Sequence, residues 1–210
     1  MVVDYIYNFL KKRHFWRYAS FSEIAELYVS KTLRTVAINI AAGFTSIYLY
    51  KIGYSLVFIL IFWAGYYLLK IPLFFVFSHL VAKRGPKHGT LISNLLYIPA
   101  MISISFVTKN GIVSVAIWGI FTAVSTTIYY LSYMIDFSKV RSVERSGEEI
   151  AFMNIFEKIA ICVSPVIGGL IALFFGPRIL MLVSALLFLI AALPLMNTSE
   201  PVRVDQKVNF

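Results

Sequence analysis

Long apolar segments separated by short polar ones follow each other along nearly the whole chain. Six of these segments are long enough to cross a bilayer as helices, which takes about 17–25 residues. They cover about 31–50, 54–81, 90–107, 112–135, 152–175 and 179–196. A helix is expected in each, because a backbone amide in lipid must find its hydrogen-bond partner within its own segment. The pattern therefore predicts an all-α integral membrane protein with six transmembrane helices.

The composition agrees with this prediction and narrows the function. Hydrophobic residues make up 60% of the 210 residues, well above the roughly 45–50% of globular domains. The net charge of +9 does not indicate a nucleic-acid partner, because the bases sit in short connections rather than in a stripe on one face. The sequence holds no glycine-rich phosphate loop, no metal-spaced His/Cys cluster and no nucleophile–base set. We therefore expect neither an enzyme nor a cofactor or metal site.

The distribution of Lys and Arg predicts the orientation in the membrane. Fifteen of these bases lie in or next to the N-terminal arm, connections two–three and four–five, and the C-terminal tail. Lys31 and Arg34 are counted with the basic arm. Only Lys51, Lys109 and Arg178 lie at the connections on the other side. Because cytoplasmic loops carry the excess of bases, both termini are expected in the cytoplasm and the protein in the cell membrane.

The two ends of the chain differ from the six-span domain, which is expected over residues 30–197. In the arm, residues 1–29, one helical face would carry Ile6, Phe9, Leu10 and Trp16 beside a Lys/Arg cluster. This favours a helix lying in the cytoplasmic interface, and an ordinary basic arm that is partly disordered is the alternative. The tail, residues 198–210, is polar and is expected to be flexible.

Two segments that open the third and sixth spans resemble each other. "RGPKHGTLISNLL" begins at Arg84 and "FGPRILMLVSALL" at Phe175, so a Gly-Pro pair starts both helices. An odd number of crossings separates them, so they start from opposite membrane faces. This predicts that spans 1–3 and 4–6 form an inverted 3+3 repeat, as found in secondary transporters. Coincidence between two leucine-rich helix starts is the alternative.

The connection between spans two and three resembles a signature of the major facilitator superfamily. That signature reads Gly-x-x-x-Asp-(Arg/Lys)-x-Gly-(Arg/Lys)-(Arg/Lys), and "SHLVAKRGPK" from Ser78 keeps Lys83, Gly85 and Lys87. Ala82 replaces the acid that helps lock the two halves of family members, so this lock is absent or formed differently. In span five, "SPVIGG" is similar to the family's Gly-Pro-x-x-Gly-Gly. The small residues there imply close helix packing at Pro165, Gly168 and Gly169.

The resemblance covers about residues 30–196 and implies one six-helix half of a major facilitator fold. Typical members have two parallel halves, so two copies of this chain would build a complete transporter. A parallel homodimer is therefore expected. A heterodimer with a separate partner half and a fragment of a twelve-helix protein are the alternatives.

The resemblance also implies that spans one and four line a central cavity, and polar residues at helical spacing run along both. Lys70, deep in span two, is a candidate for binding an anionic group or changing protonation, with snorkelling to the interface as the alternative. Helix–helix packing is the alternative for the polar stripes. The candidate substrate-binding residues are Asn39, Ser46, Lys70, Trp118, Thr122, Ser125, Tyr129 and Tyr133.

Charged residues near the cytoplasmic ends of the spans are candidates for gating or coupling. They are Lys83, Arg84, Lys87, Asp136, Arg141 and Glu157. The resulting hypothesis is a half-size secondary active transporter that moves a small organic solute, alone or with a proton, by alternating access. A lipid or amphiphile translocator and a non-transporting membrane subunit are the alternatives. Lipid, solute and a second copy of the chain are the expected partners.

Overall fold

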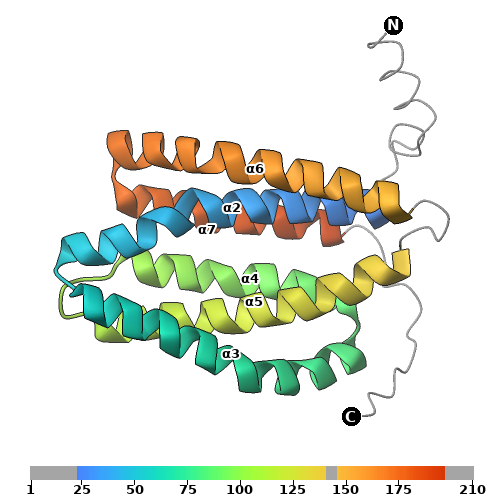
Figure 1. The fold of residues 1–210 in the computed structure, drawn as a ribbon, viewed down its shortest axis with the longest axis horizontal. Coiled ribbons are helices and arrows are strands. Elements are labelled where there is room, and N and C mark those ends of the chain that lie inside the picture. The colour runs from blue at the N-terminus through green and yellow to red at the C-terminus, as the bar shows by residue number, and fades with distance from the viewer. Residues whose placement is uncertain (1–22, 141–145, 197–210) are drawn as a thin grey trace, which may run out of the picture.

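Helices make up the computed structural model, which describes residues 23–140 and 146–196. They are α2 (Glu23–Ile52), α3 (Leu56–Arg84), α4 (Pro86–Ser105), α5 (Ile112–Val140), α6 (Ser146–Phe175), α7 (Pro177–Ala192) and the short 3-10 helix η1 (Leu193–Met196). The six α-helices run back and forth along the long axis of the molecule (Figure 1). Each predicted span falls on one of them, or on α7 and η1 together, with at most two residues beyond the helix at one end.

Five of the helical segments are long and apolar enough to cross a membrane: Ala25–Ile52, Leu56–Ala82, Ile112–Phe137, Ile150–Phe175 and Pro177–Met196. Helix α4 is not among them, although it coincides with the predicted third span and buries a polar face that includes Lys87, Ser93 and Asn94. The part of the chain that the structure describes is therefore all helical and of the membrane-embedded kind. The predicted interfacial helix in residues 1–22, Arg141 and the tail lie outside the described residues.

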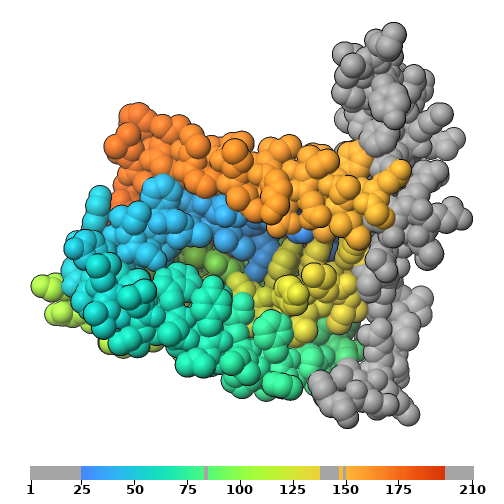
Figure 2. All heavy atoms as spheres, viewed as in Figure 1, coloured from blue at the N-terminus to red at the C-terminus, as the bar shows by residue number. Residues whose placement is uncertain are grey.

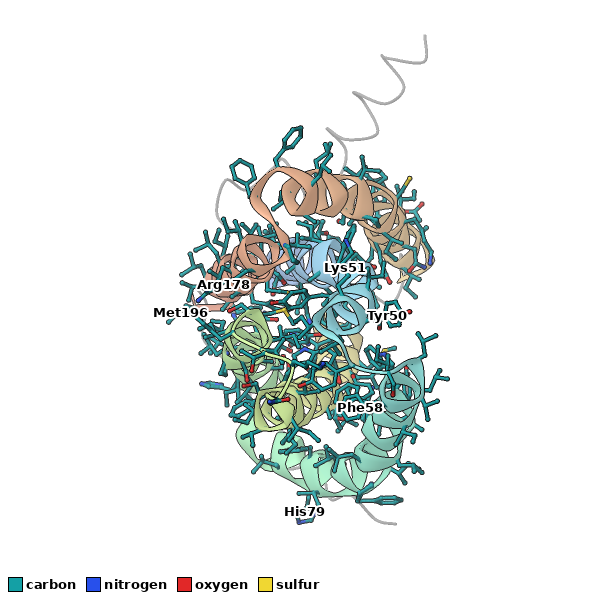
Figure 3. The ribbon with its side chains drawn as sticks, turned by 90° about the vertical axis from the view of Figure 1, so that its left-hand side faces the viewer. Tyr50, Lys51, Phe58, His79, Arg178 and Met196 are labelled. Carbon is teal, nitrogen blue, oxygen red and sulfur yellow. The ribbon has the colours of Figure 1, made fainter. Side chains whose placement is uncertain are left out.

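The helices form an elongated bundle with two unlike sides. α2 packs against α6 and α7, α5 packs against α3 and α4, and α4 packs against α7. Seen along the helices, α4 and α7 lie on one side and α3 and α6 flank the other (Figure 3). Within an 18-residue apolar stretch of each span, only 6% of the residues are buried in α3 and 17% in α6, against 44% in α5 and α7. α3 and α6 therefore present most of their apolar surface outward.

Close contact between α2 and α6 is made at Gly168. A Cβ atom on this glycine would lie 2.3 Å from the carbonyl oxygen of Ile40. Only a residue without a side chain lets the two backbones approach this closely. Gly168 is one of the three residues predicted to serve helix packing. A Cβ atom on Gly169 would lie 3.5 Å from the Phe44 ring, which is an ordinary contact, and Pro165 is exposed inside α6.

The two Gly-Pro helix starts adopt the same backbone conformation. Gly85 before α4 has φ 93° and ψ 146°, and Gly176 before α7 has φ 86° and ψ 163°. A positive φ favours glycine. The proline that follows occupies the first helical turn, where its missing amide would have had no partner. The resemblance noted in the sequence is therefore also a resemblance of local structure.

Candidate functional site

A cavity of about 440 Å³ lies between α2, α3, α5 and α6. It opens on the side of the bundle that α3 and α6 flank, and the surface is hollowed there between α2 and the α3–α5 side (Figure 2). Both charged and aromatic side chains contribute to its wall. The lining residues are Lys31, Arg34, Thr35, Ile38, Asn39, Lys70, Phe74, Thr126, Tyr129, Tyr130, Glu157 and Ile161.

Arg34 contributes the most deeply buried charge of the cavity wall, with 2% of its surface exposed. Its guanidinium donates to Asn94 Oδ1 at 2.6 Å and to Ser125 Oγ at 3.2 Å. The same group lies 3.9 Å from the centre of the Tyr129 ring, a distance at which the ring face attracts a cation. Among the described residues Arg34 forms no ion pair, and its Nε has no hydrogen-bond partner. Neutral dipoles and rings alone therefore hold this charge in place.

Lys31 and Glu157 form an ion pair at one edge of the cavity, joining α2 to α6. Lys31 Nζ lies 2.7 Å from Glu157 Oε2, with side chains 14% and 28% exposed. The ammonium also lies 4.9 Å from the centre of the Tyr133 ring. Because both partners are partly exposed, the pair can open without leaving a fully buried charge behind. That property suits a contact that is made and broken.

Lys70 brings a third cation to the cavity from α3. It is half-buried, and three aromatic rings surround its ammonium, with centroids 5.5 to 6.0 Å from Nζ. Within the described part of the chain it has no carboxylate partner. The side chain therefore faces the interior of the bundle from the middle of a membrane-spanning helix, the position in which an ionisable residue usually marks function.

Only part of the predicted substrate-binding set lines the cavity. Asn39, Lys70 and Tyr129 do so, and Glu157 from the gating set joins them. Tyr133 lies beside the wall, where it contacts Lys31, stacks on Tyr129 and donates to Met153 Sδ.

The remaining predicted residues serve contacts between helices. Ser46 accepts a hydrogen bond from Trp63 Nε1 at 3.1 Å. Trp118 belongs to the buried apolar cluster and stacks on Phe62. Ser125 donates to the carbonyl of Ser93 at 2.6 Å, and Thr122 is buried. The surroundings of these residues are those expected for helix–helix packing, the alternative interpretation of the polar stripes.

The predicted gating residues lie in unlike surroundings. Lys87 forms a buried ion pair with Glu26, at 2.9 Å between Nζ and Oε2, which joins the beginnings of α2 and α4. Asp136 is buried near the end of α5. The side chains of Lys83 and Arg84 fall outside what the structure describes, as does Arg141.

Sequence reasoning missed Lys31, Arg34 and Thr126. The two bases stand close to the N-terminal cluster and were assigned to the basic arm. Because α2 begins at Glu23, however, Arg34 lies about three turns inside it. Thr126 lies one position past the polar stripe on α5, and its hydroxyl pairs with that of Tyr66 at 3.0 Å. Both bases fall in the first turn of the predicted span 31–50, and a start signal for α2 would have placed them deeper inside the helix.

A bundle of apolar helices around a charged cavity defines an α-helical membrane protein with an internal polar site. Within residues 23–140 and 146–196, no three His, Cys, Asp or Glu side chains are placed to hold a metal ion. The family model of the Major Facilitator Superfamily matches residues 10–209. The chain therefore belongs to the Major Facilitator Superfamily, whose members are transporters. Comparisons with curated proteins and with solved structures gave no match.

Proposed function

We propose that this protein is a half-size secondary active transporter that moves a small organic solute through the cavity by alternating access. The cavity is the observation that supports this function most directly, because three basic side chains and one acidic side chain on membrane-embedded helices line it. Charged side chains are costly at this depth, and they mark substrate or ion pathways where they occur. Membership of a transporter superfamily supports the same function.

An inverted 3+3 repeat is part of this proposal. The repeat relates α2 to α5, α3 to α6, and α4 to α7. Under this relation the contact between α2 and α6 corresponds to the contact between α5 and α3. Likewise, the contact between α2 and α7 corresponds to the contact between α5 and α4. The shared conformation at Gly85 and Gly176, which lie at opposite ends of the bundle, supports the same relation (Figure 1). Alternating access in such folds is rocking of one bundle against another around a fixed site.

A parallel homodimer supplies the missing wall of the cavity. The cavity opens sideways between α3 and α6, so in a single bundle its charged lining would meet lipid. A second copy related by a twofold axis along the membrane normal covers this opening with an identical face. Each lining residue is then presented twice to the solute. A separate partner half in the same place is the alternative that the test below must exclude.

Both termini are proposed to face the cytoplasm. Lys51 and Arg178, two of the three bases assigned to the other side, lie at the end of the bundle that faces the viewer in Figure 3. That end is opposite the Gly85 turn, which carries the loop bases (Figure 1). The clustering of bases at one end fits the rule that cytoplasmic loops carry more Lys and Arg.

Solute movement in proteoliposomes tests the proposed transport. The purified full chain is reconstituted, and efflux of matched anionic, neutral and cationic solutes is compared with that of protein-free vesicles, with dithionite reduction of labelled lipid as a second readout. Saturable movement of a soluble solute is expected. Movement of labelled lipid alone would indicate a lipid translocator, and no movement of either would indicate a non-transporting subunit. Both results contradict the proposal.

The mass of the detergent-solubilised protein tests the dimer. A mass of two chains is expected, because twofold pairing is the proposed way of closing the cavity. A strictly monomeric particle that transports would contradict the homodimer.

A further inference from the structure

The ionisable side chains of the cavity do not balance. Lys31, Arg34 and Lys70 face one carboxylate, Glu157, so the lining carries a net charge of +2 when all four groups are ionised. Lys31 is neutralised by Glu157 at 2.7 Å. The excess therefore belongs to Arg34 and Lys70, which come from different helices and share the same cavity.

Neither of these two bases has a carboxylate partner among the described residues. The guanidinium of Arg34 is held by the Asn94 amide, the Ser125 hydroxyl and the Tyr129 ring. The ammonium of Lys70 lies within 6.0 Å of the centres of three aromatic rings. Buried charges in proteins are usually paired, because the removal of an unpaired ion from water is unfavourable. Two unneutralised cations around one cavity therefore define a place for negative charge.

Two hydrogen-bond donors of the cavity wall are also unused. Arg34 Nε and the Tyr129 hydroxyl are buried and have no hydrogen-bond partner among the described residues. Both residues line the cavity. Because the two atoms are covered, an acceptor reaches them through a shift of the ring or of the guanidinium. An oxyanion could then accept from both, in charge-assisted bonds stronger than neutral ones.

We infer that the cavity binds a small organic anion whose carboxylate or phosphate group lies between Arg34 and Lys70. This substrate class rests on the proposed transport function and deepens it. Phe74 and Tyr130 on the wall provide an aromatic surface for the uncharged body of the solute. The Lys31–Glu157 pair sets the strength of the site, since loss of Glu157 would free a third base toward the cavity.

Cysteine modification by charged reagents measures the sign of the charge in the cavity, whatever solute the protein carries. Thr126→Cys on α5 and Ile161→Cys on α6 place single thiols on two walls of the cavity, in a Cys162→Ser background. The rates of reaction with anionic sulfonatoethyl and cationic trimethylammonioethyl methanethiosulfonate are compared and normalised to a free thiol. We expect the normalised ratio to favour the anionic reagent about tenfold or more, as focused charge in a low-dielectric cleft does.

Charge-changing variants assign the effect to the named residues. Lys70→Gln should lower the ratio about threefold, and Glu157→Gln should raise it about threefold, because they remove charges of opposite sign. Lys51→Gln, which removes an exposed base at the end of α2, is the matched control and should leave the ratio unchanged. Opposite shifts of the two cavity variants are not expected of residues that only support folding. A thermal midpoint for each variant checks that it is folded.

A ratio at or below one, or a ratio that neither cavity variant moves, overturns the inference. Millimolar glutarate should also slow modification of both thiols, whereas 1,5-pentanediol of the same length should not, and equal slowing by both would overturn the anion preference. Failure here is separable from failure of the proposed function. Saturable transport of neutral or cationic solutes with a ratio below one removes the anion site and leaves the transporter. A cavity that strongly favours the anionic reagent, in a protein that moves no solute, removes the transporter and leaves the anion site.

Discussion

Glu26 and Lys87 join the first turns of α2 and α4 through an ion pair whose side chains are 0% and 7% exposed. Lys87 belongs to the segment that resembles the family signature, in which Ala82 occupies the position of the acid. The acid that this base contacts therefore comes from another helix of the same bundle. Removal of one partner leaves a charge buried with a weaker set of contacts, which is more damaging than removal of both.

Lys87→Met should therefore destabilise the protein by about 3 kcal/mol, and the double variant Glu26→Gln with Lys87→Met should recover most of the loss. Unfolding in mixed micelles, followed by helical circular dichroism, measures both effects. Lys51→Met, which changes an exposed base on α2, is the control and should unfold like the parent. Equal destabilisation by the single and double variants would show that the pair is not the contact that matters.

Replacement of Arg34 should separate folding from transport. Arg34→Met loses the hydrogen bonds to Asn94 and Ser125 but keeps the packed stem and removes the desolvation cost of the guanidinium, so the two effects should offset and the free energy of unfolding should stay within about 1 kcal/mol of the parent. Transport should fall by at least about tenfold, because the cavity loses a charge that no other described residue replaces. Reconstituted flux and micellar unfolding of the same preparation provide the two readouts.

Arg178→Met is the matched control for this replacement. Arg178 stacks on Phe106 at 4.1 Å, at the end of the bundle and outside the cavity. Its loss should leave flux unchanged. Parental flux in Arg34→Met would show that Arg34 only supports the packing of α2 against its neighbours.

Gly168→Ala should loosen the contact of α6 with α2. The added methyl group would lie 2.3 Å from the carbonyl oxygen of Ile40, and backbone cannot give way as a flexible side chain can. A loss of about 1–3 kcal/mol is expected from such overpacking. Gly43→Ala is the control, since its Cβ meets nothing within 4 Å and alanine is the better helix former. A parental thermal midpoint in Gly168→Ala would contradict the close contact.

The inverted repeat predicts that the two Gly-Pro turns lie on opposite sides of the membrane. His88→Cys and Arg178→Cys place exposed thiols three and two residues after the turn glycines, again without Cys162. In intact cells an impermeant maleimide should label Arg178→Cys, whereas His88→Cys should need permeabilised cells. Labelling of both without permeabilisation would exclude the repeat and the proposed orientation together.

The positions of the helices were predictable because their signal is local. An apolar run of sufficient length must become a helix in lipid, whatever surrounds it. The Gly-Pro starts at Gly85 and Gly176 were equally visible, since the positive φ that glycine allows is a property of the turn alone. The start of α2 was less visible, and the unrecognised turns between Glu23 and Lys31 placed Arg34 in the wrong environment.

The direction of the polar faces was not predictable, because a stripe of Ser and Thr suits water and another polar helix equally well. Along α5 the stripe residues Thr122, Ser125 and Ser132 are buried, and Ser125 bonds to α4, which buries a polar face of its own that includes Ser93 and Asn94. The cavity is lined by Tyr129 of this stripe and by the neighbouring positions Thr126 and Tyr130. Sequence periodicity locates a face on a helix, but the neighbour that meets it is decided by tertiary packing.

Arg34 ties solute occupancy to the cohesion of the bundle. From α2 its guanidinium reaches Asn94 on α4, the Tyr129 ring on α5 and, at 5.4 Å, the ring of Phe188 on α7. An oxyanion that draws this group toward itself would weaken three interhelical attachments in one displacement. Binding of the anion would therefore make α2 more mobile relative to the other helices of its half. The empty and the solute-bound protein would then differ in rigidity as well as in occupancy.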